Sequence, residues 1–453
     1  MESTLNQKQL EVLNLFKRGK NLCITGPAGV GKSYLINVFK KWASNNGKVI
    51  AVTAMTGNAA YLINGKTLHS WSGIGLGNLS EEELVSKIKK NFVSKKKWLG
   101  TNILVIDEVS MLTGLLFNKL NYIAMELRRN QYSPFGGMQV VLLGDFYQLP
   151  PVQSEDFVFE SGAFKENIEH IIDLKEIIRQ SDTNFQDILN NIRVNKLTED
   201  NIKVLKSRTY EELEKENNNF KEDMDDLGIK PTKIYTLKKD VENINNKKLL
   251  ELKNEIKVYL PKTSVEANDD SNFKQKEIDM IVENMDKSGR YEEMLKLCIG
   301  AQVMFTVNKS DMGLVNGSRG VVTSFQDNYP VVKFNNSVSE VIKSHSFEYE
   351  DIKKGFIYRT QIPLKLAWCI TVHKSQGMSI DIAEVDIGNN VFEYGQTYVA
   401  LSRVKSLEGL YIMKFNPKKI KCHPKVDNFY KNRNKPNIKK EEENKNSIKR
   451  FFS

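Results

Sequence analysis

The segment Gly26-Pro27-Ala28-Gly29-Val30-Gly31-Lys32-Ser33 decides the fold class of this chain. It comes directly after a short apolar run at residues 21–25, and residues that suit a helix follow it. A strand, a glycine-rich loop and a helix in this order form a phosphate-binding loop. The alternative is a chance match, and the flanking segments argue against it.

Three glycines, Gly26, Gly29 and Gly31, allow backbone N–H groups of this loop to face phosphates. The N-terminus of the following helix adds positive potential at the same place. We therefore expect Lys32 to reach the β- and γ-phosphates of ATP, and Ser33 to coordinate Mg²⁺. The loop alone predicts only that the chain binds a nucleotide.

Apolar runs recur along the first part of the chain, at residues 48–53, 103–106 and 140–143. Helical stretches separate them, and the last two runs end in Asp within two residues. Continuous apolar runs of this kind are typical of parallel strands that are covered on both faces. The sequence therefore predicts an α/β fold whose first lobe, residues 1–170, carries the phosphate loop.

A second α/β lobe is expected over residues 171–420, with a strand at 232–237 and a helix at 241–252. Residues 254–289 are charged and irregular, and several short strands follow them with Asn-Gly and Asp-Asn turn signals. We expect an insert over residues 254–360 that contains a small β-barrel. Its predicted strands are at residues 300–305, 320–325 and 331–334.

Two further segments interrupt or follow this pattern. Residues 72–98 have a glycine-rich start and several lysines, and we expect a small inserted subdomain there. Residues 428–453 are rich in Asn, Lys and Glu, so a disordered basic tail is expected.

The length of 453 residues is too great for one ordinary core and fits two to four domains. The net charge is +10 and the pI is about 9.0. This charge indicates either a solvated lysine-rich surface or a polyanionic partner such as nucleic acid, and the motifs favour the second.

The cysteines are far apart and form no CxxC pair, so neither a zinc site nor a disulfide framework is indicated. A reducing compartment is expected: nucleus, cytoplasm or a viral replication site, without secretion. No apolar segment resembles a signal core or a membrane span, so no membrane partner is expected. The cysteines are Cys23, Cys298, Cys369 and Cys422.

Acidic and amide side chains follow two of the predicted strands. Asp107 can hold Mg²⁺, and Glu108 can polarise the attacking water, unless the two merely cap the strand. Gln148 is placed to bind a γ-phosphate or its water. Phe146 and Tyr147 either stack on bases or pack in the core.

Together these segments resemble the superfamily-one DNA helicases of the Pif/RecD type, and the Pif branch more closely. Nine motifs match in order between Leu5 and Met413, which is nearly the whole chain except the tail. Single motifs of this kind are weak, whereas nine in sequence are specific. They are Gly26–Ser33, Thr53–Ala60, Thr67–Trp71, Ile106–Leu112, Gly144–Pro151, Arg179–Gln180, Leu314–Gly320, Thr371–Gly377 and Tyr398–Arg403.

The resemblance implies two RecA-like lobes with ATP between them and single-stranded DNA across their top. It implies that Gln9 reads adenine, and that Arg179 and Arg403 neutralise γ-phosphate charge from the second lobe when the lobes close. A surface ion pair is the alternative for Arg179. The resemblance also implies that residues 72–98 form a wedge at the fork and that the β-insert is SH3-like.

DNA contacts are implied for short polar side chains, which hold phosphates without fixing sequence. For His373 the alternative is a structural histidine that links the lobes. The segment Lys95–Lys97 either touches phosphates or is a solvated turn. The expected DNA-contacting residues are Thr56, Thr67, His69, Thr371, His373 and Ser375, with Phe146 as a stacking ring.

The chain ends in a segment that resembles a sliding-clamp-binding peptide. A single helical turn would place Ile448, Phe451 and Phe452 on one side, facing an apolar pocket. The segment departs from the motif at Lys445, where Gln is usual. A random apolar terminus is the alternative.

We therefore expect an ATP- and Mg²⁺-dependent DNA helicase that moves 5′ to 3′, is monomeric when free, and acts on single-stranded and forked DNA. The resemblance places it in replication, recombination, repair or telomere maintenance. Two alternatives remain at this point: a DNA-stimulated ATPase that translocates without separating strands, and a nucleotide-gated binding module.

Overall fold

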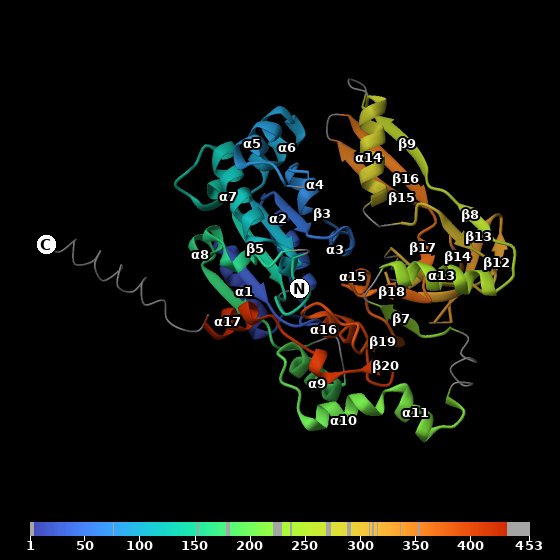
Figure 1. Cartoon of the computed structure of the whole chain (residues 1–453). Coiled ribbons are helices and arrows are strands. Elements are labelled where there is room, and N and C mark those ends of the chain that lie inside the picture. Colours follow the sequence, from blue (N-terminus) through green and yellow to red (C-terminus); the bar gives the residue numbers. More distant parts are fainter. Residues whose placement is uncertain are drawn as a thin grey trace.

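The structure is a computed structural model of the whole chain (Figure 1). The described residues are 4–75, 77–151, 154–177, 182–220, 229–235, 238–268, 273–287, 291–307, 309, 312–314, 316–335, 337–351 and 354–432.

The first lobe is built on a six-stranded sheet in the order β3-β2-β4-β5-β1-β6, and all its neighbouring strands are parallel. β1 and β4 are buried at every residue because helices cover both faces, as their continuous apolar runs predict. The strands are β1 (Leu22–Thr25), β2 (Ile50–Ala54), β3 (Lys66–Thr67), β4 (Ile103–Asp107), β5 (Gln139–Gly144) and β6 (His170–Asp173). The principal helices are α1 (Gln7–Lys17), α2 (Lys32–Asn45), α3 (Gly57–Leu62), α4 (Leu68–Ser72), α7 (Gly114–Arg128) and α8 (Gly162–Asn167).

The expected boundary between residues 170 and 171 falls inside a strand. β6 pairs in parallel with β1, from Leu22 opposite His170 to Thr25 opposite Asp173. The first sheet therefore extends to Asp173, because pairing with the central strand holds this segment in the first lobe.

The second lobe has a four-stranded parallel sheet in the order β18-β7-β19-β20. Its strands come from both sides of a long insert, since β7 precedes the insert and the other three follow it. The strands are β7 (Thr232–Tyr235), β18 (Cys369–Thr371), β19 (Ala383–Ile387) and β20 (Leu410–Phe415). The helices of this lobe are α9 (Thr183–Arg193), α10 (Glu199–Ser207), α11 (Tyr210–Glu216), α13 (Lys238–Glu251), α15 (Val372–Ser375) and α16 (Gln396–Leu401), and the chain then continues into α17 (Pro424–Asn432).

The insert between α13 and β18 contains two antiparallel sheets, ordered β14-β13-β12-β11-β17 and β15-β16-β9, and a separate β8–β10 pair. The second sheet carries α14 and projects toward the same end of the molecule as α5 and α6, which span residues 81–100 (Figure 1). The strands and helix are β8 (Lys257–Tyr259), β9 (Lys262–Ala267), α14 (Gln275–Lys287), β10 (Leu295–Leu297), β11 (Gln302–Phe305), β12 (Arg319–Gln326), β13 (Tyr329–Phe334), β14 (Ser339–Val341), β15 (His345–Asp351), β16 (Gly355–Gln361) and β17 (Leu364–Leu366).

Two expectations for this insert are wrong. The described residues between 254 and 287 are not irregular, since most of them form β8, β9 and α14. All six residues of β9 are exposed, so the strand has no apolar alternation and exists because it pairs with the distant β16. The insert also runs past residue 360, because β17 pairs with β11.

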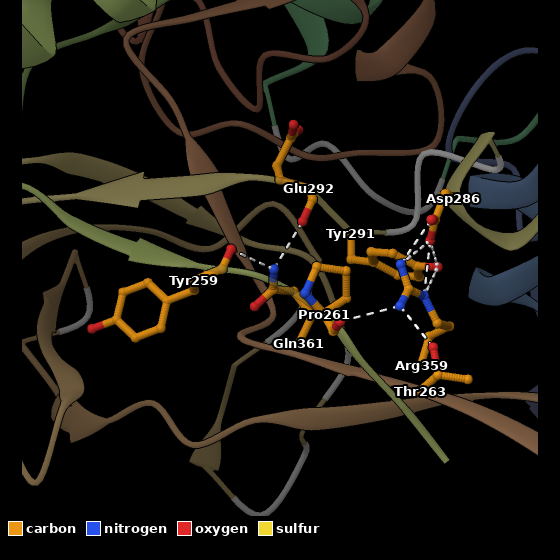
Figure 2. Close-up of polar contacts among 8 residues, drawn as sticks. All are labelled: Tyr259, Pro261, Thr263, Asp286, Tyr291, Glu292, Arg359 and Gln361. Carbon is orange, nitrogen blue, oxygen red and sulfur yellow. Dashed lines mark hydrogen bonds and ion pairs between the residues drawn. The ribbon is translucent and has the colours of Figure 1, made fainter. Parts of the chain in front are cut away.

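Polar side chains of β16 fasten the projecting sheet to its surroundings (Figure 2). Arg359 forms an ion pair of 2.7 Å with Asp286 of α14 and donates a 3.1 Å hydrogen bond to the carbonyl oxygen of Pro261. Two residues further on, Gln361 donates to the carbonyl oxygens of Tyr259 and Glu292 at 3.0 and 2.9 Å. The strand therefore ties three segments of the insert together.

The expected wedge subdomain contains α5 (Glu81–Lys90) and α6 (Phe92–Gly100), which pack on α7. Trp98 is fully buried and donates a 2.9 Å hydrogen bond to the carbonyl oxygen of Ser72. Arg128 of α7 caps the end of α6 with hydrogen bonds to the carbonyl oxygens of Trp98 and Leu99 in the helix and of Thr101 directly after it. The Lys95–Lys97 run lies in helix α6, so the interpretation as a turn is wrong.

The last described helix, α17, returns to the first lobe and lies beside α8 (Figure 1). Val426 is fully buried in the core of that lobe, Phe429 stacks on Phe159 at 4.4 Å, and Tyr430 stacks on Tyr147 at 4.7 Å. Residues 428–432 are therefore ordered helix and not part of a disordered tail, because the i, i+3, i+4 spacing makes an apolar face. Among the described helices, none is long and apolar enough to cross a membrane.

Candidate active site

The phosphate loop lies between β1 and α2, at the carboxyl edge of the first sheet. Gly26 has φ 153°, and a Cβ there would lie 2.3 Å from the carbonyl oxygen of Leu174. Gly31 is the N-cap of α2 with φ 83°, a left-handed conformation that glycine adopts without strain. The glycines thus let the loop turn tightly and leave the helix N-terminus open to a phosphate.

Lys32 lies inside this loop. Its Nζ donates hydrogen bonds to the carbonyl oxygens of Gly26 and Pro27 at 2.7 and 2.8 Å. Burial lowers the pKa of Lys32, and the carboxylates of Asp145 and Glu108 oppose that effect. The ammonium is therefore held at the loop with negative charge beyond it, which suits contact with phosphate oxygens.

The two acidic residues stand at the end of β4. Burial and the neighbouring Glu108 raise the pKa of Asp107 to about 7, and the backbone N–H of Glu108 donates to its carboxylate at 2.9 Å. Glu108 has φ 54°, a strained conformation for a residue with a side chain. A carboxylate and a hydroxyl near the phosphates fit Mg²⁺, which is bound through one or two protein oxygens and substrate phosphates. Ser33 is exposed in the first turn of α2, and its role as the residue that supplies this hydroxyl stays a prediction.

A glutamine of the second lobe meets these residues. The side-chain amide of Gln376, at the end of α15, donates a 2.9 Å hydrogen bond to Oε2 of Glu108 and lies 3.4 Å from Oε1 of Gln148. Gln376 is only 5% exposed. The sequence prediction assigned no role to Gln376, although it lies in the quoted Thr371–Gly377 motif.

Helix α16 of the second lobe also touches the nucleotide site. The backbone N–H of Ala28 donates a 3.1 Å hydrogen bond to the hydroxyl of Tyr398. Gly395, the N-cap of α16, lies so close to the first lobe that a Cβ would be 2.5 Å from the carbonyl oxygen of Tyr147 and 2.6 Å from that of Gln148. The interface between the two lobes therefore lies next to the phosphate loop.

A buried ion pair links the two lobes at the same interface. Arg193 of α9 binds both carboxylate oxygens of Asp145, at 2.9 Å each, and Asp145 is fully buried. The guanidinium lies 4.7 Å from the ring centroid of Tyr147 and 5.5 Å from that of Tyr430. Sequence reasoning missed this pair, since Arg193 stands in no motif that we quoted.

Comparison with known proteins identifies the family to which the chain belongs. Residues 4–223 match the family model of the PIF1-like helicases, and residues 281–325 match that of the 2B domain of the DNA helicase Pif1. The chain belongs to the PIF1-like helicase family.

A curated relative, the ATP-dependent DNA helicase PIF1 of Xenopus laevis, is 38% identical over 94% of this chain, which spans 64% of that relative's length. A crystal structure of Pif1 from Candida albicans is 37% identical with a TM-score of 0.74, covering 94% of this chain and 99% of that one. Bacteroides Pif1 in complex with ADP-AlF3 and single-stranded DNA is 29% identical with a TM-score of 0.63, covering 96% and 98%. Two RecA-like lobes with inserts are thus confirmed as the fold.

The arginines expected at the nucleotide of a PIF1-like helicase are only partly located. Arg403 is 3% exposed and donates to the carbonyl oxygen of Val399 at 3.0 Å and to the hydroxyl of Ser402 at 2.8 Å. It follows α16, whose Tyr398 reaches the phosphate loop, so its role at the γ-phosphate stays a prediction. Arg179 lies outside the described residues.

Gln9 of α1 is buried and holds the phosphate loop from behind. Its amide donates a 3.2 Å hydrogen bond to the carbonyl oxygen of Val30, and its oxygen accepts from the backbone N–H of Asn6 in a capping box. These contacts position the loop. The reading of adenine by Gln9 stays a prediction.

Two expected DNA contacts of this PIF1-like helicase are wrong. Phe146 is 1% exposed and packs edge-on against Phe159 and Phe429, so its ring is a core ring and has no face for a base. Ser375 is fully buried, and its hydroxyl donates to the carbonyl oxygen of Val372 at 2.7 Å. The motifs place these residue types correctly, but the local backbone turns both side chains inward.

The threonines expected at DNA lie at helix starts. Thr67 caps α4, Thr371 caps α15, and Thr56 accepts a hydrogen bond from a backbone N–H at the start of α3. His69 is half-buried, and burial lowers its pKa. His373 is 39% exposed, with Nε2 3.6 Å from Glu393 of the same lobe, so this contact does not link the lobes.

The C-terminal residues Ile448, Phe451 and Phe452 lie outside the described residues, and so does the rest of the expected clamp-binding peptide.

Proposed function

We propose that this chain is an ATP- and Mg²⁺-dependent DNA helicase that moves 5′ to 3′ along single-stranded DNA. The hydrogen bond from Gln376 of the second lobe to Glu108 of the first carries the proposal. It joins the residue suited to activate water to a segment on the lobe that must move. The printed names of the relatives, which are ATP-dependent DNA helicases, support the same activity.

At the nucleotide, Lys32 would bind the phosphates, and Asp107 and Ser33 would hold Mg²⁺, which supplies positive charge to the phosphate oxygens. Glu108 would orient and deprotonate the attacking water. Gln148, whose Oε1 lies 3.4 Å from the Gln376 amide, would orient the same water or the γ-phosphate.

Closure of the two lobes on the nucleotide would complete the hydrolytic site. Arg403 follows the helix that already touches the phosphate loop, and a rotation of its side chain out of its contacts with Val399 and Ser402 would direct its charge to the γ-phosphate. Arg179 would act with it. An arginine supplied across a cleft stabilises the transition state only when the cleft is closed, so hydrolysis becomes tied to lobe movement.

Single-stranded DNA would cross both lobes. The helix starts at Thr56 and Thr67 would offer hydroxyls and backbone N–H groups to phosphates. Thr371 is 6% exposed and its hydroxyl accepts a hydrogen bond from the backbone N–H of Lys374, so it would contact DNA only after that segment moves. His69 and His373 lie in the same segments. The relative solved with single-stranded DNA supports this substrate, and the wedge and SH3-like insert would act at a fork.

Unwinding of forked DNA with a 5′ or a 3′ single-stranded tail tests the proposal. We expect unwinding only from the 5′ tail, and none with Lys32→Ala or Arg403→Ala, while strand binding is partly retained. Unwinding that survives Lys32→Ala would refute the nucleotide site. DNA-stimulated ATP hydrolysis without strand separation would show a translocase, and nucleotide binding without turnover would show a binding module.

The wider role follows from the same family. We propose action in replication, recombination, repair or telomere maintenance, as a monomer when free, in a reducing compartment such as the nucleus, the cytoplasm or a viral replication site. We also propose that Ile448, Phe451 and Phe452 bind a sliding clamp. Changing both phenylalanines to Ala should weaken clamp binding and spare ATP hydrolysis; unchanged clamp binding would refute the tail proposal.

A further inference from the structure

A cavity of about 400 Å³ lies at the carboxyl edge of the first sheet, apart from the phosphate loop. Three of its lining residues follow three neighbouring parallel strands: Met55 comes directly after β2, Met111 lies four residues after the end of β4, and Pro151 lies beyond β5. His69 of α4 and Leu115 of α7 line it as well. Ligands of open α/β sheets bind at this edge.

The lining is suited to a flat, polarisable group. Two methionine thioethers and a proline ring make favourable contacts with aromatic faces. His69 adds a flat ring, and burial favours its neutral form. The volume lies at the lower end of the roughly 300–1,000 Å³ that small-molecule sites occupy, so the cavity suits one nucleotide-sized group.

The position of the cavity indicates which flat group would enter it. Lys119 lines the cavity, and its ammonium is held by the carbonyl oxygens of Gly77 and Leu79 at 2.9 and 2.7 Å, which fixes the wedge-side wall. Met55 directly precedes Thr56, and His69 belongs to the segment that begins at Thr67; both segments are proposed to hold the strand. A base of that strand would therefore reach the cavity without leaving its track.

The cavity is also linked to the water-activating residue. Met111 ends a 3-10 turn, Val109–Met111, whose N-cap is Glu108. This turn has little free space, because a Cβ at Gly144 of β5 would lie 2.8 Å from the backbone nitrogen of Val109. A displacement of Met111 would therefore be passed to Glu108 rather than absorbed.

We propose that this cavity takes up one unstacked base of the bound single strand, and that its occupancy is transmitted through the Val109–Met111 turn to Glu108. The inference rests on the proposed function, since it requires that the chain bind single-stranded DNA. It adds a base-binding site and a route by which DNA would stimulate hydrolysis.

Leu115→Trp is the variant that tests the proposal. Leu115 is 59% exposed at the rim of the cavity, so an indole there can fill the opening without disturbing the core. Leu250→Trp, on α13 of the second lobe and 66% exposed, is the matched control. Thermal melts of both variants show whether each is folded.

The first measurement is a scan in which 2-aminopurine replaces one base at a time in a single strand bound to the full chain. We expect one position to brighten on binding, because its base leaves the stack, and this signal to be lost in Leu115→Trp and kept in Leu250→Trp. A scan in which no position differs between wild type and Leu115→Trp overturns the proposal.

The second measurement is the ratio of DNA-stimulated to DNA-free ATP hydrolysis. We expect this ratio to fall at least threefold in Leu115→Trp and to stay unchanged in Leu250→Trp. A ratio that stays unchanged in Leu115→Trp refutes the link to Glu108. Wild-type protein that neither binds nor unwinds DNA would sink the proposed function itself, which distinguishes the two failures.

Discussion

The amide of Gln376 lies 2.9 Å from Oε2 of Glu108, although 268 residues separate them in the chain. Glu108 is held in a left-handed conformation at the end of β4, and Gln376 ends a short helix of the other lobe. A carboxylate that is to activate water must be oriented, and an amide donor orients it. The second lobe therefore contacts the carboxylate that we propose to activate water.

Replacing Gln376 by Leu should slow ATP hydrolysis. A hydrogen bond to a charged group is worth about 1.5–3 kcal/mol, which corresponds to roughly a 10- to 100-fold fall in kcat. Gln275→Leu, an exposed glutamine on α14, is the control and should have no effect. Steady-state ATPase assays and strand-binding titrations measure this; a normal kcat in Gln376→Leu would show that the contact is only structural.

Removing Arg193 should destabilise the protein strongly. Arg193→Met would leave the buried carboxylate of Asp145 without its partner, and breaking a buried pair costs about 3–5 kcal/mol. The double variant Arg193→Met with Asp145→Leu should recover most of that loss, because no charge is then stranded. Urea unfolding of the single and double variants measures the coupling; additive losses would contradict it.

Gly395→Ala should push the second lobe away from the first at their interface. The left-handed φ of 72° costs about 1–2 kcal/mol for alanine, and its Cβ would also meet two backbone oxygens at 2.5 and 2.6 Å. Gly47→Ala is a matched control, since Gly47 has φ 62° and nothing within 4 Å of a Cβ. We expect a similar small loss of stability from strain in both, but at least a tenfold loss of ATPase activity only in Gly395→Ala. Equal activity in the two variants would argue against this interface contact.

Lys365 of β17 should make stability depend on alkaline pH. Burial and, to a smaller extent, the nearby ammonium of Lys374 lower its pKa from 10.5 to about 8, and Glu292 opposes both. The unfolded chain then binds more protons than the folded one between about pH 8 and 10.5, so this group's penalty is complete below pH 8 and is relieved as pH rises. Lys365→Met should therefore be more stable than wild type at pH 7, by up to about 3 kcal/mol.

Unfolding free energies of wild type and Lys365→Met, measured from pH 7 to 10, test this expectation. The difference between them should shrink as the pH rises. A difference that is constant over this range would show that the lysine is not desolvated in the folded protein.

Much of the nucleotide site could be predicted from local sequence. The phosphate loop, Asp107 and Glu108 directly follow apolar runs that predict strands. A glycine-rich loop and an acidic pair in these two positions together are typical of a nucleotide site. Hydroxyl and aromatic residues were less predictable. Ser375 and Phe146 both stand in the expected motifs, yet both are buried, because a helix turn or a strand end directs neighbouring side chains to opposite sides.

The sequence by itself determined the α/β class, the positions of several strands of the first sheet and the glycine-rich loop between a strand and a helix, because short-range periodicity and glycine spacing encode them. Only the tertiary structure decided which parts of the second lobe close the site. Gln376, Arg193 and Gly395 act through contacts with residues far along the chain, and such contacts leave no periodic trace in the residues between. The same holds for β9, whose exposed residues form a strand only because β16 pairs with them.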